Sequence, residues 1–223
     1  MSKQRFHPSR EHLYLAFYKP YGVLSQFSTD EVSLKRTLAE FGFPKDVYPI
    51  GRLDWDSEGL LLLSNDGRLN QALLHPAGAH ERIYLAQVEN IPSRQALEHL
   101  RQGVLIQGQM SLPAQASLLQ IEPDLPERPV PIRFRQNIPT AWLSLTLTEG
   151  RNRQVRRLTA AVGHPTLRLV RVAIGALALK DLALQPGEWQ PLTQRQILSA
   201  LSASGSAQKP MSPRISPPPI GEP

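Results

Sequence analysis

The chain has 223 residues, of which 41% are apolar, and this content is enough for a folded core and excludes a wholly disordered protein. It contains no cysteine, which excludes disulfides, thiolate metal sites and cysteine nucleophiles. The formal net charge of +6 suits a polyanionic partner such as RNA. Residues 150–180 hold six arginines, one lysine and no acidic residue, so the positive field is expected to be local.

The two ends of the chain differ in composition from its middle. Residues 1–11 are polar and basic and are expected to form a flexible leader without a hydrophobic signal segment. Residues 202–223 are rich in serine, proline and glycine and are expected to be disordered. No apolar run approaches the roughly 18 residues that a membrane-spanning helix needs. A soluble cytoplasmic protein with one folded region over residues 12–201 is therefore expected.

Strands are predicted where apolar residues alternate or run together. These segments are 13–18, 60–64, 82–89 and 141–148, the last with three leucines on one face. The stretch 113–140 contains six prolines and is predicted to be a long irregular connection.

Three helices are predicted between and after these strands. The first is short and capped by Asn65 or Asp66, and the second runs from Ser93 to about Gly103. The third lies after Gly150 and ends at Gly163. Their inward residues are predicted to be Leu69, Leu73 and Leu74 in the first helix, and Val155, Leu158, Thr159 and Val162 in the third. Strands mixed with few helices favour an α+β fold over a regular βαβ repeat.

The densest cluster of charged residues is Gly51–Gly59, which directly precedes a run of leucines. It holds three carboxylates, Asp54, Asp56 and Glu58, between two glycines that permit unusual turns. A loop at the end of a strand often carries chemistry. The alternatives are a solvated acidic turn, or a divalent-metal loop that lacks the further ligands and glycine of a calcium site.

Gly-Arg-Leu-Asp at 51–54, followed by Asp-Ser-Glu-Gly and four leucines at 56–63, resembles the catalytic motif of the RsuA/RluB/RluE/RluF family of ribosomal RNA pseudouridine synthases. Three further motifs resemble the same family in the same order. They are Lys-Pro-Tyr-Gly at 19–22, Arg-Ile-Tyr at 82–84 and the arginine-rich segment 149–157. One departure is Trp55, since the residue after the aspartate is usually basic in this family.

The resemblance covers about residues 13–192. It implies a pseudouridine synthase catalytic domain over residues 12–201, with helices packed on a mixed, largely antiparallel sheet and two subdomains around a central RNA-binding cleft. Few residues precede the first expected strand, and segment 129–143 resembles the RluE-type subgroup, which lacks an S4 RNA-binding domain. The subgroup implies 23S ribosomal RNA, or a precursor of the large subunit, as substrate. No cofactor or metal is implied, and a monomer is expected.

The resemblance also implies three catalytic residues. Asp54 would be the nucleophile, whether it attacks C1′, attacks C6 of the base or stabilises a charged sugar. Tyr84 would stack on the uracil and help to move a proton, the alternative being a core tyrosine on an alternating strand. Arg156 lies at the edge of the apolar stripe of its helix and would pair with Asp54, the alternative being an arginine facing solvent.

The remaining basic residues of the motifs are interpreted as RNA contacts. Arg52 would also help to splay the flipped nucleotide, unless it forms a salt bridge with Asp56. For Lys19 the alternative is an exposed turn lysine. The full set is Lys19, Arg52, Arg82, Arg151, Arg153, Arg157, Arg168 and Arg171.

Two rival functions use the same residues. One is an inactive ribosomal-RNA-binding assembly factor on the same fold, which would not need Asp54, Tyr84 and Arg156 together. The other is a metal-dependent nuclease or glycosidase using Asp54 and Glu58, which EDTA would inactivate, whereas a synthase would be indifferent.

Overall fold

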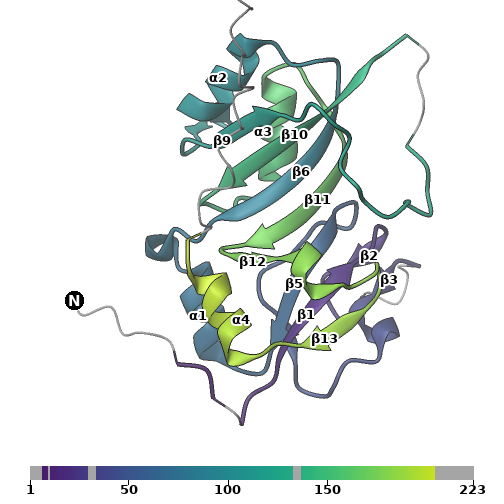
Figure 1. Ribbon diagram of the computed structural model, residues 1–223, viewed down its shortest axis with the longest axis vertical. Helices are drawn as coiled ribbons and strands as arrows, with labels where there is room; N and C mark the ends of the chain where they lie inside the picture. The colour runs from purple at the N-terminus through teal and green to yellow at the C-terminus, as the bar shows by residue number, and fades with distance from the viewer. Residues whose placement is uncertain (1–6, 10, 30–33, 133–136, 204–223) are drawn as a thin grey trace, which may run out of the picture.

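The computed structural model describes residues 7–9, 11–29, 34–132 and 137–203 (Figure 1). Most of the expected leader and tail lies outside these residues. Within them, the chain forms one nine-stranded sheet, two small two-stranded sheets and four α-helices. The expected α+β class, with a largely antiparallel sheet and helices packed on it, is confirmed.

The main sheet has the strand order β13-β1-β5-β11-β6-β10-β9, with β12 beside β11 and β4 beside β5. These strands are β1 (Tyr14–Lys19), β4 (Tyr48–Pro49), β5 (Glu58–Ser64), β6 (Arg82–Glu89), β9 (Gln115–Leu118), β10 (Thr140–Leu147), β11 (Thr166–Ile174), β12 (Leu177–Ala178) and β13 (Trp189–Pro191). The small sheets pair β2 (Val23–Leu24) with β3 (Arg36–Thr37), and β7 (Leu105–Ile106) with β8 (Gln109–Met110).

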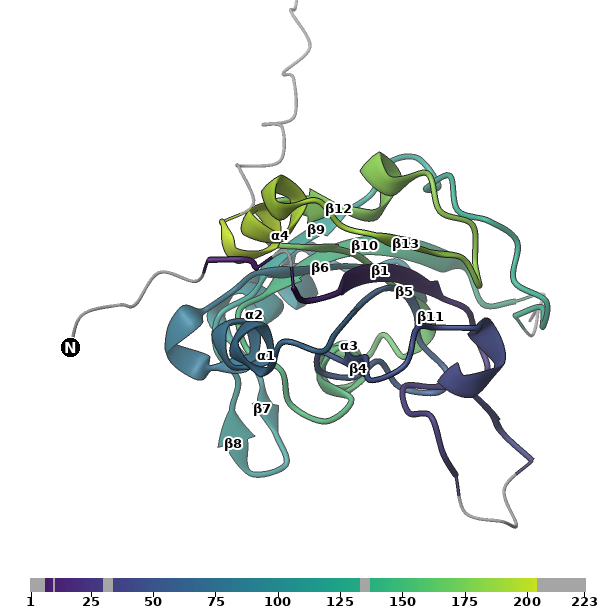
Figure 2. The same cartoon turned by 90° about the horizontal axis from the view of Figure 1, so that it is seen from below.

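The α-helices are α1 (Gly67–Leu74), α2 (Arg94–Gln102), α3 (Gln154–Ala161) and α4 (Gln194–Leu201). Three short 3-10 helices accompany them: η1 (Leu38–Phe41), η2 (Pro76–Gly78) and η3 (Leu179–Leu182). Figure 2 shows α3 and the β7–β8 hairpin on one side of the sheet and α4 on the other.

The parallel pairing of β5 with β11 joins the two halves of the sheet. Its register places Glu58 beside Val170 and Gly59 beside Arg171. The φ of Gly59 is 108°, and a Cβ atom there would lie 2.2 Å from the carbonyl oxygen of Arg171. Only glycine fits this position. The strand that follows the acidic loop is therefore fixed closely against β11.

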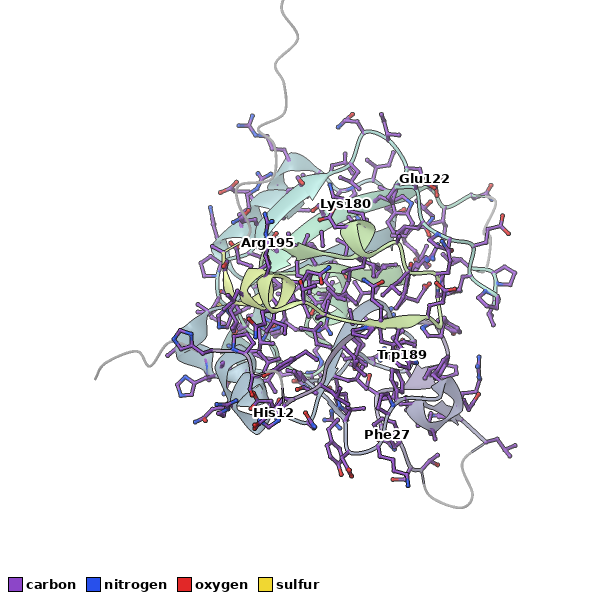
Figure 3. All side chains as sticks on the ribbon, turned by 60° about the horizontal axis from the view of Figure 1, so that its bottom comes forward. His12, Phe27, Glu122, Lys180, Trp189 and Arg195 are labelled. Carbon is purple, nitrogen blue, oxygen red and sulfur yellow. The ribbon has the colours of Figure 1, made fainter. Side chains whose placement is uncertain are left out.

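Strands β1 and β5 are buried on both faces, which explains their nearly continuous apolar sequences. One face packs in a cluster that includes residues of α1 and α4, and the other packs in an aromatic cluster. In the aromatic cluster Phe43 contacts both Phe27 and Trp189, which are labelled in Figure 3. A third cluster joins β6, β10 and β11 to α2 and α3. The sheet is thus a rigid support for the loops at its edge.

Most of the predicted elements are confirmed, with small shifts at their ends. The strand predicted at 82–89 is β6, and Ser93 caps α2. Asp66 rather than Asn65 caps α1, and Leu74 is exposed instead of inward. Helix α3 is shorter than predicted because residues 151–153 form a turn before it. The predicted irregular connection contains β9, and the strand β11 was not predicted.

Candidate active site

A cleft of about 840 Å³ opens before β5, where the acidic loop faces β6 and β11. Asp54 and Tyr84 both line it, together with Arg52 and Arg153. The Asp54 side chain is 29% exposed, so it is reachable from the cleft and partly shielded from bulk water. The structure thus brings the predicted nucleophile and the predicted stacking tyrosine to one cavity.

The backbone on either side of Asp54 is tied to the segment that follows β1. The Ser25 hydroxyl accepts a hydrogen bond from the Leu53 amide at 3.0 Å and donates to the Leu53 carbonyl at 2.8 Å. The Gly22 amide donates to the Trp55 carbonyl at 2.9 Å. These contacts fix the path of the loop without using the Asp54 carboxylate, which supports a preorganised position for that group.

Lys19 extends this anchoring from inside the protein. Its side chain is fully buried, and its Nζ donates to the Ser57 carbonyl at 2.7 Å and to the Pro20 carbonyl at 3.0 Å. The prediction that Lys19 contacts RNA is therefore wrong, and so is the alternative of an exposed turn lysine. A buried ammonium or amine needs acceptors, and here two carbonyls supply them.

Burial lowers the pKa of Lys19 to about 7, although the negative charges of Glu58, Asp56 and Asp54 oppose that shift. Between pH 7 and the ordinary lysine pKa, unfolding therefore takes up a proton. The free energy of unfolding should rise with pH across this window, by at most about 1.4 kcal/mol per pH unit. Below pH 7 Lys19 is protonated in both the folded and the unfolded state. It should therefore cause no change in the free energy of unfolding with pH there. Urea unfolding of Lys19→Met should lack this rise, and equal pH profiles would contradict the prediction.

The arginines of the α3 region converge on Asp56. Both Nη atoms of Arg153 donate to the Asp56 carboxylate at 2.9 Å. Arg156 Nη2 donates to the Asp56 carbonyl at 2.7 Å, and its Nε lies 3.4 Å from the carboxylate. The expected Arg156–Asp54 pair is wrong within the described residues. The ion pair within 4 Å of Asp54 is instead formed by Arg153, whose Nη1 lies 3.8 Å from Oδ2.

Helical periodicity predicted Arg156 as the partner of Asp54, but it does not apply to Arg153, which precedes the first residue of α3. It is the N-cap of α3 and has a φ of 51°, in the left-handed region, so its side chain does not follow the helical wheel. The sequence indicates Asp56 only as part of an acidic turn, a metal loop or a partner of Arg52. Nothing in its local sequence distinguishes its orientation from that of Asp54 two residues earlier.

Asp56 is expected to position the two arginines. Burial disfavours its ionised form, but hydrogen bonds from Arg153 and the charges of Arg156 and Arg153 outweigh it, so the pKa of Asp56 lies below its usual value. Asp56→Asn should reduce kcat by roughly 10- to 100-fold through misplacement of these groups. Single-turnover rates would measure it, with Glu40→Gln, an exposed carboxylate on η1, as control. Equal rates in the two variants would refute a positioning role.

Tyr84 lies in β6, opposite Leu145 of β10 and Arg171 of β11. It is half-buried and packs against two of the apolar clusters while also lining the cleft. A tyrosine that packs in the core and a tyrosine that stacks on the uracil are therefore compatible interpretations of Tyr84. Its contact with uracil remains a prediction.

Of the two phosphate contacts predicted on β11, the one at Arg168 is wrong because its side chain is buried, and the one at Arg171 remains a prediction. Arg168 forms a two-point ion pair with Glu58, with both N–O distances 2.9 Å, and also donates to the Pro126 carbonyl. Arg171 is 4% exposed, and its Nε donates to the Leu60 carbonyl, but it also lines the cleft. Arg168 thus ties β11 to β5 instead of facing solvent.

The other predicted RNA contacts differ in how accessible they are. Arg52 is exposed at the cleft, and the alternative salt bridge with Asp56 is not formed, since the described partners of that carboxylate are two other arginines. Arg82 lines the cleft but donates to the carbonyls of Leu73 and His80. Arg151 also lines the cleft.

The metal-loop alternative finds no support in the described part of the chain. No group of three or more histidine or carboxylate side chains is arranged there to hold a metal ion. Of the three acidic residues of the loop, Glu58 points into its ion pair with Arg168. Among the same residues, no helix combines the length and apolar character needed to cross a membrane.

Comparison with known proteins adds independent evidence. The chain is 54% identical over 172 residues to the ribosomal large subunit pseudouridine synthase E of Xanthomonas campestris, covering 77% of this chain and 91% of that protein. It is 50% identical to the protein of the same name from Vibrio vulnificus, covering 80% of this chain and 74% of that protein. It is 36% identical to ribosomal large subunit pseudouridine synthase B of Bacillus subtilis, covering 87% of this chain and 75% of that protein.

The fold gives the same result. A crystal structure of a pseudouridylate synthase superposes with a TM-score of 0.68 and 28% identity, covering 85% of this chain and 74% of that chain. Residues 13–161 match the family model described as RNA pseudouridylate synthase, a span that contains the acidic loop, β6 and α3. With that match over most of the chain, the protein belongs to the RNA pseudouridylate synthase family and is an RNA pseudouridine synthase.

Proposed function

We propose that this enzyme converts one specific uridine of large-subunit ribosomal RNA to pseudouridine, with Asp54 as the nucleophile. Two relatives that are 54% and 50% identical to this chain are named ribosomal large subunit pseudouridine synthase E, which supports this substrate. The observation that carries the mechanism is the shared cleft, in which a partly exposed Asp54 lies near the charge of Arg153 and shares the lining with Tyr84. Ribosomal RNA as substrate would place the enzyme in the cytoplasm, and a monomer suffices, since all these groups come from one chain.

The reaction is an isomerisation, so its atoms balance without a cofactor. The N1–C1′ bond breaks, the uracil turns, and C5 bonds to C1′ while the C5 proton passes to solvent and N1 takes up a proton. A carboxylate can assist by forming a covalent intermediate or by stabilising a positive sugar. Either path requires the target nucleotide to leave its stack, since C1′ and the base are otherwise shielded.

The test is a map of pseudouridines in ribosomal RNA from a deletion strain. Carbodiimide treatment followed by alkali and primer extension should show one stop missing in the large-subunit RNA, restored by a plasmid copy of the gene. An unchanged map would refute the proposed substrate. Activity of the purified protein should be unaffected by EDTA, whereas a metal-dependent nuclease or glycosidase would lose it.

RNA binding is expected to depend on the basic residues before and within α3. Arg151 lines the cleft and contacts Glu149 and the Met110 carbonyl. Arg157 lies on α3 and contacts Gln107 and Asn152, of which Asn152 lines the cleft. Replacing both arginines by glutamine should weaken binding and reduce the slope of log K against log salt by up to about 1.4, roughly 0.7 for each phosphate contact to a single strand.

The matched control removes the same charge elsewhere. Arg94 and Arg195 are exposed on α2 and α4, and Arg195 is labelled in Figure 3. Replacing both by glutamine should leave the salt slope unchanged, because neither residue lines the cleft or lies on α3, whose Arg157 adjoins the lining residue Asn152. Filter binding at several salt concentrations would measure it. Equal slopes for the two double variants would move the RNA surface away from α3.

A further inference from the structure

The residue after the proposed nucleophile presents an aromatic ring at the cleft. Trp55 lines the cleft and is 37% exposed. Its backbone is held by the amide of Gly22, and its ring lies 5.3 Å from that of Tyr21 at an angle of 53°. The indole is therefore supported from behind and preorganised.

Two cations flank this aromatic pair. The guanidinium of Arg128 lies 4.2 Å from the centre of the Tyr21 ring, and Lys35 Nζ lies 5.6 Å from the centre of the Trp55 ring. They come from different segments, Lys35 directly before β3 and Arg128 from the connection after β9. Figure 1 shows this connection descending beside the sheet towards β2. Four side chains from four segments thus gather around Trp55, which lines the cleft.

This arrangement has the chemistry of a single-stranded RNA contact. Bases stack on exposed aromatic rings, and adjacent cations attract the phosphates of the same strand. When one nucleotide is flipped out of a stack, its neighbours lose a stacking surface. Tyr84 is already the candidate for the flipped uracil itself, so the ring of Trp55 is available for a second base.

We propose that Trp55, supported by Tyr21, stacks on the base next to the flipped uridine, with Lys35 and Arg128 near the adjoining phosphates. The proposal rests on the proposed function, because it requires a flipped uridine at Asp54. Trp55 would then help to position the substrate and to select it by the exposed strand that flanks the target. It would act on binding of the RNA more than on the chemical step.

The test combines protein variants with changes in the RNA. The substrate is a fragment of large-subunit RNA around the mapped uridine, intact or with an abasic nucleotide on the 5′ or the 3′ side of the target. Trp55→Ala should raise KM for the intact fragment by roughly 5- to 150-fold and change kcat by less than about threefold. Trp55→Phe should stay within about threefold of the wild type. Tyr48→Ala, which removes an exposed aromatic ring outside the cleft lining, is the matched control and should have no effect.

The decisive result is whether the effects of Trp55→Ala and of the abasic nucleotide depend on each other. For one of the two neighbours, the abasic fragment should cost the wild type as much as Trp55→Ala costs on intact RNA, and the two losses should not add. Additive losses at both neighbours, or equal losses in Trp55→Ala and Trp55→Phe, would overturn the stacking proposal. Failure of the proposed function would look different, since the wild type would then form no pseudouridine on intact RNA.

Discussion

Asp54→Asn is expected to reduce the rate of pseudouridine formation by roughly 10³-fold or more, as removal of a nucleophile does in other covalent mechanisms. The amide has nearly the same size as the carboxylate, but it can neither attack carbon efficiently nor stabilise a positive sugar. Within the described residues the only ion pair of this carboxylate within 4 Å is with Arg153, at 3.8 Å. The fold should therefore tolerate the change, and RNA affinity should stay within about threefold.

Release of tritium from RNA labelled at C5 of uridine measures this rate directly, because the new C5–C1′ bond displaces the C5 proton to solvent. Asp181→Asn, an exposed aspartate on η3, is the matched control and should be fully active. Residual activity above about a tenth of the wild-type rate would show that Asp54 is not the nucleophile. A wild-type protein that binds the RNA without releasing tritium would instead support the assembly-factor hypothesis.

Elements with a complete local signal were predicted well. The alternation at 82–89 is β6, and the serine before α2 accepts a hydrogen bond from the amide of Ala96. In both cases the physical cause lies within a few residues, as a face to bury or an amide to cap. The same is true of the leucines of β10, which are all buried.

The strand β11 was missed because its causes are distant in sequence. Its arginines indicated an exposed basic surface, but Arg168 is neutralised by Glu58, which is 110 residues away. Lys19 was misjudged for the same reason, since its acceptor Ser57 belongs to another segment. Sequence reveals the charge of a side chain and not its partner. The motif as a whole still located the cleft, because Asp54 and Tyr84 both line it.

The second large effect expected is on stability, from the ion pair between Glu58 and Arg168. Its side chains are only 3% and 10% exposed, and two N–O contacts of 2.9 Å join them beside the junction of β5 and β11. Removing one partner leaves a buried charge without compensation, which costs about 3–5 kcal/mol. Arg168→Met should therefore lower the free energy of unfolding in urea by this amount, and the melting temperature by roughly 10 °C.

The cause can be separated from simple loss of packing by removing both charges. In the double variant Glu58→Leu with Arg168→Met, no charge of this pair remains buried, so its loss should be well below the sum of the single losses. If the double variant is as unstable as that sum predicts, the effect comes from packing or from the lost bond to the Pro126 carbonyl, and the electrostatic explanation fails.

An exposed pair in the same protein provides the sharpest comparison. Arg36 and Glu40 approach to 2.7 Å, closer than the buried pair, but their side chains are 56% and 44% exposed. If distance decided the contribution, Arg36→Met would be the more damaging change. Because water solvates both exposed charges before and after the substitution, we expect it to leave the free energy of unfolding nearly unchanged. Burial, and not separation, then determines which of the two arginines the fold requires, and equal losses in the two variants would contradict this.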